Sequence, residues 1–180
     1  MSKVQDAANF FIYVVNHDED DNITNMKLNK LLYYAQGCYL SRTGKPLFDA
    51  SIEAWKLGPV VPEIYQKYKV CGSAPIQDLE ERFSLNVFSK DELDVLVDVM
   101  REYGRYTGSA LVSMTHKSDT PWSKAWEQGW PVIPEQEIKT YFERHPVKRF
   151  NGSRLKEVSK FPYEWYDPAE DEEWEAYLRD

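Results

Sequence analysis

The stretch that decides the fold is KLNKLLYYAQGCYLSRTGKPLFDASIEAWKLGPVVPEIYQKYK, residues 27–69. Its first half predicts a long amphipathic helix that Thr24 caps and that Gly44 ends in a left-handed conformation. Apolar residues recur at the spacing of one helix face: Leu28, Leu31, Leu32, Ala35 and Tyr39. Three further side chains, Tyr33, Tyr34 and Gln36, lie beside this face, where they either pack as the edge of the core or contact a partner.

The second half of the stretch predicts a strand followed by a rigid corner. Residues 51–56, SIEAWK, alternate as a short strand does, and we expect Gly58 and the following proline to end it. Pro62 then opens a helix that runs to about Tyr68. Proline at both ends of GPVVP restricts the backbone, so the corner either fixes how the strand crosses the helices or presents a preorganised contact surface. The two uses are compatible.

Capping signals place the remaining helices. A first helix follows the Ser2 and Gln5 capping box and runs to about Asn16. The capping box of Ser89 and Glu92 starts another, to Tyr103, which we expect to be the central helix. Shorter helices are predicted at residues 108–116, 120–127 and 135–144. Residues 84–88 are predicted to form a second short strand.

Together these elements predict a mainly α (α+β) fold, a compact helical domain with a small two- or three-strand antiparallel sheet. The domain is expected to span residues 1–145, with a basic-then-acidic extension over 146–180. The acidic loop HDEDDN, residues 17–22, lacks the glycine and the terminal glutamate of a calcium-binding EF-hand loop, so it is interpreted as a solvated loop and no metal site is predicted.

Composition favours a soluble intracellular protein. The 180 residues are 42% hydrophobic and 29% charged, which fits one folded domain with a tail and predicts no membrane span. The opening MSKVQDAANFF has no uninterrupted apolar region of the kind found in a signal peptide, and Cys38 and Cys71 form no ligand-spaced pair. A cytoplasmic location is therefore expected.

Charge is unevenly distributed along the chain. The net charge is −8, yet residues 146–160 hold five bases and one acid, whereas residues 167–180 hold seven acids and one base. The net negative charge disfavours direct binding to nucleic acid. A transcription regulator that acts through the basic stretch 148–160 remains as a separate hypothesis. The helix predicted from Asp167, with an apolar stripe at Trp174, Tyr177 and Leu178, either packs against the basic stretch or binds a partner groove.

Catalytic signals are sparse. In THKSDTPW, His116 and Asp119 form the best acid–base pair, but no nucleophile elbow, phosphate loop or HExxH motif accompanies them. The alternative is that His116 and Thr115 bond a helix end and position Trp122. No catalytic residue and no cofactor are predicted, and an enzyme acting on a small molecule through His116 and Asp119 remains as a separate hypothesis.

The order of several motifs resembles that of the Panacea domain, the SocA-like antitoxin family. The blocks YYAQG and AWKLGPVVP are followed by the serine-capped helix, by Thr115-His116, by Thr120-Pro121-Trp122 and by a segment that ends in Tyr141-Phe142. The resemblance implies an antitoxin, often encoded beside its toxin in bacterial or prophage two-gene operons, that binds a toxic protein directly. The family's founding member is instead an adaptor that delivers its toxin to a cytoplasmic protease.

The partners implied are therefore a cognate toxin and, for an adaptor, a cytoplasmic protease. No membrane is expected as a partner, and the oligomeric state is not predicted. Candidate contact residues are taken from the long helix, the proline corner and the THKSDTPW motif: Tyr33, Tyr34, Gln36, Trp55, Gly58, Pro59, Val61, Pro62, Tyr65, His116 and Trp122.

Overall fold

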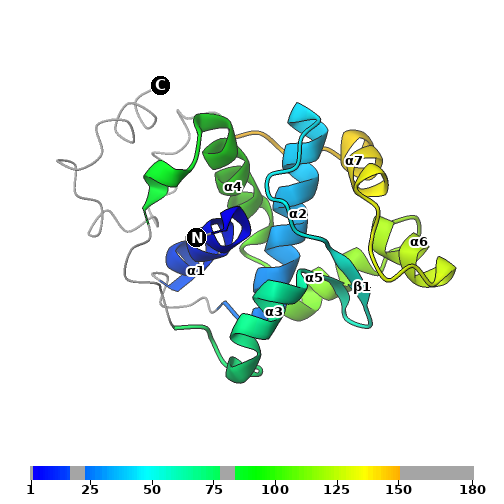
Figure 1. The fold of residues 1–180 in the computed structure, drawn as a ribbon, viewed down its shortest axis with the longest axis horizontal. Coiled ribbons are helices and arrows are strands. Elements are labelled where there is room, and N and C mark those ends of the chain that lie inside the picture. The colour runs from blue at the N-terminus through cyan, green and yellow to red at the C-terminus, as the bar shows by residue number, and fades with distance from the viewer. Residues whose placement is uncertain (1, 17–22, 78–83, 151–180) are drawn as a thin grey trace.

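The computed structural model describes residues 2–16, 23–77 and 84–150. These residues form a mainly α domain with one two-stranded antiparallel sheet, as predicted (Figure 1). The acidic loop at residues 17–22 and the helix predicted from Asp167 lie outside the described residues. Among the helices that the structure does describe, none is both long and apolar enough to cross a membrane.

Helix α2, Asn25–Thr43, lies at the centre of the domain (Figure 1). It contacts the strand β2 (Gly58–Val60) and five other helices, namely α1 (Lys3–Asn16), α3 (Pro62–Tyr68), α4 (Lys90–Tyr103), α5 (Gly108–Thr115) and α7 (Glu135–Arg144). The prediction that the helix after Ser89 is central was therefore wrong. Every residue from 27 to 38 is buried, so α2 is covered on all sides rather than along one apolar stripe.

The structure confirms the predicted start and end of α2. The hydroxyl oxygen of Thr24 accepts a hydrogen bond from the backbone N–H of Lys27 at 3.2 Å, and Gly44 ends the helix with φ of 72°. Midway along the helix, a Cβ on Gly37 would overlap the ring of Phe142 on α7. The glycine therefore lets α7 pack directly against α2.

The sheet is a hairpin of β1 (Glu53–Trp55) and β2 (Gly58–Val60), in which Glu53 pairs with Val60. The first strand ends before Gly58, as predicted, but the sequence interpretation missed that this glycine begins a return strand. Its φ of 101°, which other residues rarely adopt, lets the chain reverse at that point. On the other side of β1, the N–H of Ile133 donates to the carbonyl of Ile52 at 2.8 Å, so residues 131–133 run alongside the hairpin.

Residues 84–88 correct a second prediction. Leu85–Val87 is a 3-10 helix rather than a strand, and Ser84 caps it by accepting from the N–H of Asn86 at 3.3 Å. A second 3-10 turn, Lys69–Cys71, extends α3. The predicted starts of α4, α5 and α6 (Pro121–Gln128) are confirmed by side-chain caps at their N-termini.

After α7, residues 147–150 return to the domain and contact α4. Val147 is buried in the core, and the backbone N–H of Phe150 donates to Asp98 at 3.0 Å. Asp98 also forms an ion pair with Arg42 of α2 at 2.6 Å, and the guanidinium of Arg42 donates to the carbonyl of Val147 at 3.2 Å. Residues 147–150 thus pack on the domain, whereas the predicted division at residue 145 stays a prediction.

Candidate partner-binding surface

The hairpin is fixed to the helices beneath it by buried polar contacts. The ammonium of Lys30 donates to the carbonyl of Pro59 at 3.0 Å, and the N–H of Val61 donates to the side-chain oxygen of Asn29 at 2.9 Å. A Cβ on Gly58 would lie 2.6 Å from Cε of Lys30 and 2.8 Å from Oγ1 of Thr115. The corner therefore rests directly on α2 and α5, and its conformation is set by both.

Lys30 is an unusual anchor because its charged group is buried. Burial lowers the pKa of this lysine to about 7. Within the described residues its hydrogen-bond partner is the neutral carbonyl of Pro59, and no carboxylate forms an ion pair with it. The contact between α2 and the hairpin thus includes a titratable group.

His116 connects the end of α5 to the hairpin turn. Its Nδ1 lies 2.7 Å from the carbonyl oxygen of Val112, and its Nε2 lies 3.0 Å from the carbonyl oxygen of Lys56. Its ring packs on Trp122, with centroids 3.7 Å apart. Asp119, whose φ of 64° is left-handed, is exposed, and across the described residues no hydrogen bond joins it to His116. The arrangement agrees with a positioning role for His116 rather than with an acid–base pair.

Trp122 extends this linkage to α6. Its indole N–H donates to the carbonyl of Trp55 at 2.8 Å, and its ring stacks on Trp126 at 5.4 Å. The side chain of Trp55, which is partly buried, donates to Glu53 at 2.7 Å and packs against Tyr65 at 4.8 Å. Aromatic side chains therefore run from the hairpin onto α6.

Exposed apolar side chains gather around this linkage. The described residues contain seven large hydrophobic side chains that are exposed, and four of them lie on the hairpin turn, on α6 or on the segment beside β1. We call these four the hairpin surface, and their exposed fractions are Leu57 51%, Trp126 49%, Trp130 41% and Val132 42%. A surface with two half-exposed tryptophans is typical of a site that another molecule covers.

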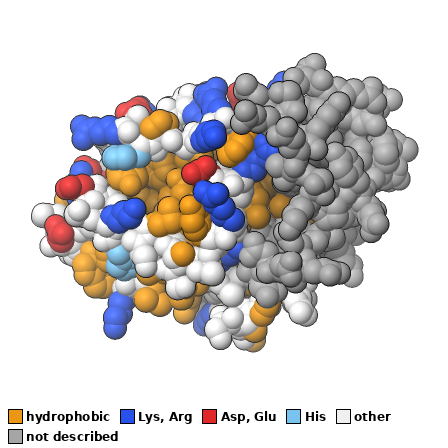
Figure 2. Space-filling model, turned by 180° about the vertical axis from the view of Figure 1, so that it is seen from behind, with side chains coloured by type: hydrophobic (Ala, Val, Ile, Leu, Met, Phe, Trp, Pro, Cys, Tyr) orange, Lys and Arg blue, Asp and Glu red, His pale blue; other side chains and the backbone are white. Residues whose placement is uncertain are grey.

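Exposed large hydrophobic side chains outside the hairpin surface include Met26, Val70 and Val87. Figure 2 shows hydrophobic side chains gathered in the middle of the face opposite to the view of Figure 1, with lysine and arginine side chains beside them. The hairpin surface is distinguished by its two tryptophans, because tryptophan contributes more to binding energy than most residues do.

The candidates on the long helix lie in the core. Tyr33, Tyr34 and Gln36 are all buried. The ring of Tyr34 stacks on Tyr103 at 3.8 Å, and burial raises the pKa of both phenol groups. The carbonyl oxygen of the Gln36 side chain accepts from the N–H of Leu47 at 2.9 Å. In this structure these residues hold elements together, and their contact with a partner stays a prediction.

The candidates of the proline corner and of THKSDTPW are brought together. Gly58, Pro59 and Val61 are buried against the helices, whereas Pro62 and Tyr65 are half-buried. These residues support the hairpin surface more than they form it. The four exposed residues that make up the hairpin surface were not among the contact residues predicted from the sequence. The available signal was the segment WEQGW, residues 126–130, in which two large aromatic residues stand among polar ones at the end of a helix.

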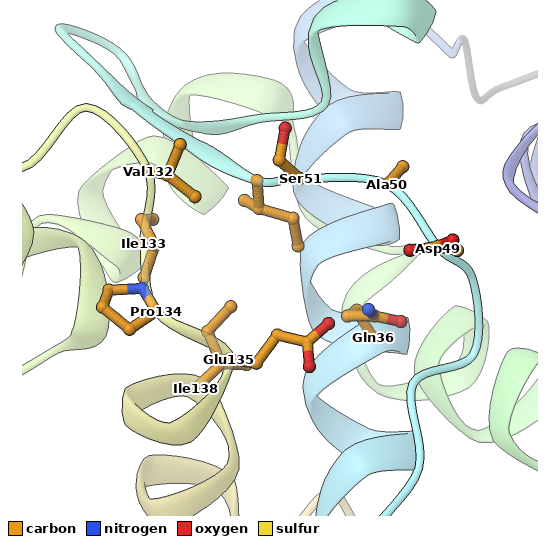
Figure 3. Close-up of a pocket in the computed structure, with 10 residues that line it drawn as sticks. Gln36, Asp49, Ala50, Ser51, Val132, Ile133, Pro134, Glu135 and Ile138 are labelled. Carbon is orange, nitrogen blue, oxygen red and sulfur yellow. The ribbon is translucent and has the colours of Figure 1, made fainter.

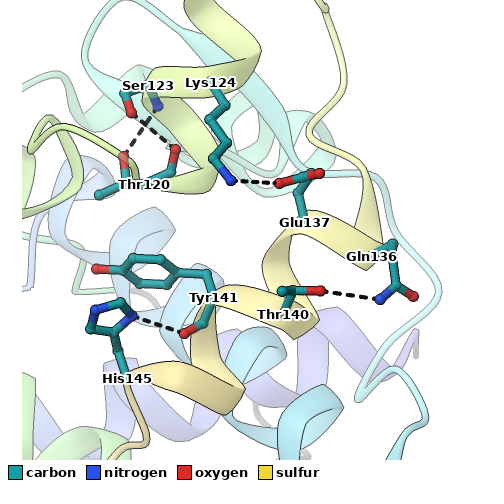
Figure 4. A network of polar contacts seen from close by, with 8 residues as sticks. All are labelled: Thr120, Ser123, Lys124, Gln136, Glu137, Thr140, Tyr141 and His145. Atoms are coloured by element: carbon teal, nitrogen blue, oxygen red, sulfur yellow. Dashed lines mark hydrogen bonds and ion pairs between the residues drawn. The ribbon is translucent and has the colours of Figure 1, made fainter.

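Helices α6 and α7 contact each other next to the hairpin surface. The ammonium of Lys124 on α6 forms an ion pair with Glu137 on α7 at 3.1 Å, and Thr120 caps α6 by accepting from the N–H of Ser123 (Figure 4). On α7, Gln136 donates to Thr140 at 3.1 Å. The ion pair thus links the two helices that flank the segment 129–134, which carries Trp130 and Val132.

Comparison with known proteins assigns the family. Residues 28–123 match the model described as antitoxin SocA-like, Panacea domain. This chain belongs to the SocA-like antitoxin family. The matched range includes the hairpin and its anchors Lys30, His116 and Trp122, whereas Trp126 and Trp130 lie beyond its end.

A curated relative supports the assignment to the Panacea domain. The chain is 34% identical over 112 residues to antitoxin SocA of Caulobacter vibrioides (strain NA1000 / CB15N). The aligned part covers 57% of this chain and 60% of that protein. No solved structure matches the chain.

Proposed function

We propose that this protein is a cytoplasmic antitoxin that holds a cognate toxin inactive by binding it directly, and that the hairpin surface makes the contact. Membership of the SocA-like family supports the antitoxin role. The observation that carries the proposal for the surface is the exposure of Trp126 and Trp130 beside a hairpin fixed by buried contacts.

Rigidity is the physical reason why this surface suits inhibition by binding. The contacts of Lys30, Asn29 and His116 already order the hairpin before a partner arrives. Binding then costs less conformational entropy than it would at a mobile loop. Large aromatic side chains on such a support bury much apolar area with few rotamers lost.

The enzyme hypothesis has less geometric support. Both ring nitrogens of His116 face backbone carbonyl oxygens of the same domain, and Asp119 does not contact it. A general base needs a nitrogen directed at its substrate. The adaptor hypothesis uses the same toxin-binding step and differs in the fate of the bound toxin, so it is the second candidate.

The product of the adjacent open reading frame is the natural candidate for the toxin. We expect that protein to arrest growth when expressed alone and that co-expression of this chain restores growth. The double variant Trp126→Ala and Trp130→Ala should weaken the purified complex by about 30-fold or more, because loss of a tryptophan anchor commonly costs ~2 kcal/mol or more.

Val70→Ser is the matched control. Val70 is an 88% exposed apolar side chain outside the hairpin surface, so its replacement should leave the affinity unchanged. Equal affinity of the wild-type protein and the double tryptophan variant would refute the assignment of the surface. Measuring the toxin's lifetime after protein synthesis is stopped separates the two mechanisms: a stable, inactive toxin supports neutralisation, and a rapidly lost one supports delivery to a protease.

A further inference from the structure

A cavity of about 270 Å³ adjoins the hairpin surface. It lies between α2, the chain at residues 49–52 and the segment that leads into α7 (Figure 3). Val132 of the hairpin surface is one of its lining residues. A partner that covers the surface would therefore also reach the cavity.

The base of the cavity is apolar and firmly held. Ile52, Ile133 and Ile138 line it and are buried, and a backbone hydrogen bond of 2.8 Å joins Ile133 to Ile52. Gln36 completes the wall, and its amide donates to the carbonyl of Phe48 at 3.0 Å. The shape of the cavity is thus set by contacts already present in the domain.

Two carboxylates border the same cavity. Asp49 comes from the chain beside α2, and Glu135 comes from the first turn of α7, where its side chain extends toward Gln36 (Figure 3). Both residues are exposed. Across the described parts of the chain, neither carboxylate has a cationic or hydrogen-bonding partner, whereas neighbouring Glu137 is paired with Lys124. The cavity therefore combines an apolar base with two carboxylates that no cationic side chain of the described residues pairs.

We propose that this cavity is the subsite for an arginine side chain of the bound toxin, an inference that rests on the proposed function. An arginine has a methylene stem that packs on the isoleucines and a guanidinium that donates to carboxylates in a planar fork. The net charge of −8 favours approach of a cationic partner. The subsite adds charge-based selectivity to the apolar contact of the hairpin surface.

The experiment uses Nα-acetyl-arginine methylamide as the probe and the citrulline analogue, which has the same shape without the charge, as its control. Binding to the full chain is followed by NMR at the backbone amides of Ser51 and Val132. We expect saturable shifts with the arginine probe and at least about tenfold weaker binding with the citrulline probe, because charge-assisted hydrogen bonds are lost.

The variant Asp49→Asn combined with Glu135→Gln should bind the arginine probe more weakly by at least about tenfold. Glu63→Gln is the matched control, because Glu63 is also an exposed carboxylate in the first turn of a helix but lies outside the cavity. Its affinity should equal that of the wild-type protein. Equal binding of the two probes, retention of binding in the double variant, or no shift at the cavity would overturn the subsite.

This outcome is separable from that of the proposed function. Rescue of growth by the wild-type protein without arginine binding would leave the antitoxin role standing and remove the subsite. Arginine binding without any neutralisation of the adjacent gene product would remove the antitoxin role and leave a cation-selective cavity. When both hold, the double carboxylate variant should also weaken the toxin complex by about tenfold, while Glu63→Gln should not.

Discussion

Replacing Lys30 by methionine tests whether a buried charge sits under the hairpin. Lys30 is 1% exposed, and its ammonium contacts the carbonyl of Pro59 at 3.0 Å. Methionine has a similar length and no charge, so it occupies the same space without the cost of desolvating an ammonium group.

The expected change in the free energy of unfolding with pH is set by the pKa of Lys30 in the folded and in the unfolded state. The pKa is about 7 in the folded protein, and about 10.4 is expected for the unfolded chain. Between these values the unfolded chain binds more protons, so the free energy of unfolding rises with pH. The destabilisation is complete below pH ~7 and disappears above pH ~10.4. From pH 7 to pH 9 the wild-type protein should therefore gain about 2 kcal/mol that the Lys30→Met variant does not gain.

Urea denaturation at pH 7, 8 and 9 measures this difference, provided that the slope m is unchanged. Subtracting the curve of the variant from that of the wild-type protein removes the contributions of all other titrating groups. Lys56→Met, on the exposed turn of the hairpin, is the control and should follow the wild-type curve. If the wild-type and Lys30→Met curves run parallel within ~0.5 kcal/mol, the ammonium is not desolvated and the account of this anchor is wrong.

Four further substitutions test the core, the corner and the role of the histidine. Leu32→Ala and Leu96→Ala remove fully buried side chains, and each should lower the free energy of unfolding in urea by ~2–5 kcal/mol; a loss below ~0.5 kcal/mol for both would contradict the packing of α2 and α4. Gly58→Ala puts a Cβ at a φ of 101° and against Lys30, so it should cost ~1–3 kcal/mol in the same assay, and a neutral effect would refute the close approach of the hairpin. His116→Ala removes one contact that orders the hairpin, but it should still restore growth in the co-expression assay, because the contacts of Lys30 and Asn29 remain and binding needs no proton transfer; loss of rescue with folding and toxin affinity intact would favour an enzyme.

Local sequence signals determined where most helices begin and end. The caps of Thr24 and Ser89, the left-handed Gly44 and the Pro121 start all appear in the structure as the sequence indicates. Each of these signals acts through hydrogen bonds or backbone angles within about four residues, so the sequence itself contains the whole interaction. The family resemblance was readable for a related reason, since YYAQG and AWKLGPVVP are continuous blocks.

Only the tertiary structure decided how these elements combine. The burial of α2 on all sides depends on helices distant in sequence, and β2 exists because Gly58–Val60 pairs with β1 while its backbone rests on α2 and α5. Residues 85–87 have no strand beside them in the described part of the chain, so an apparently strand-like sequence forms a 3-10 turn.

The candidate surface was likewise beyond the reach of local patterns. The sequence indicated Trp55 and the proline corner, but the exposure of Trp126 and Trp130 depends on how the hairpin packs against α6 and the segment 129–134. The cavity needs Gln36, Asp49 and Glu135, which lie about one hundred residues apart at the extremes and meet only after folding. Solvent exposure and long-range contacts are properties of the packed chain, because each depends on which distant segment covers a given side chain.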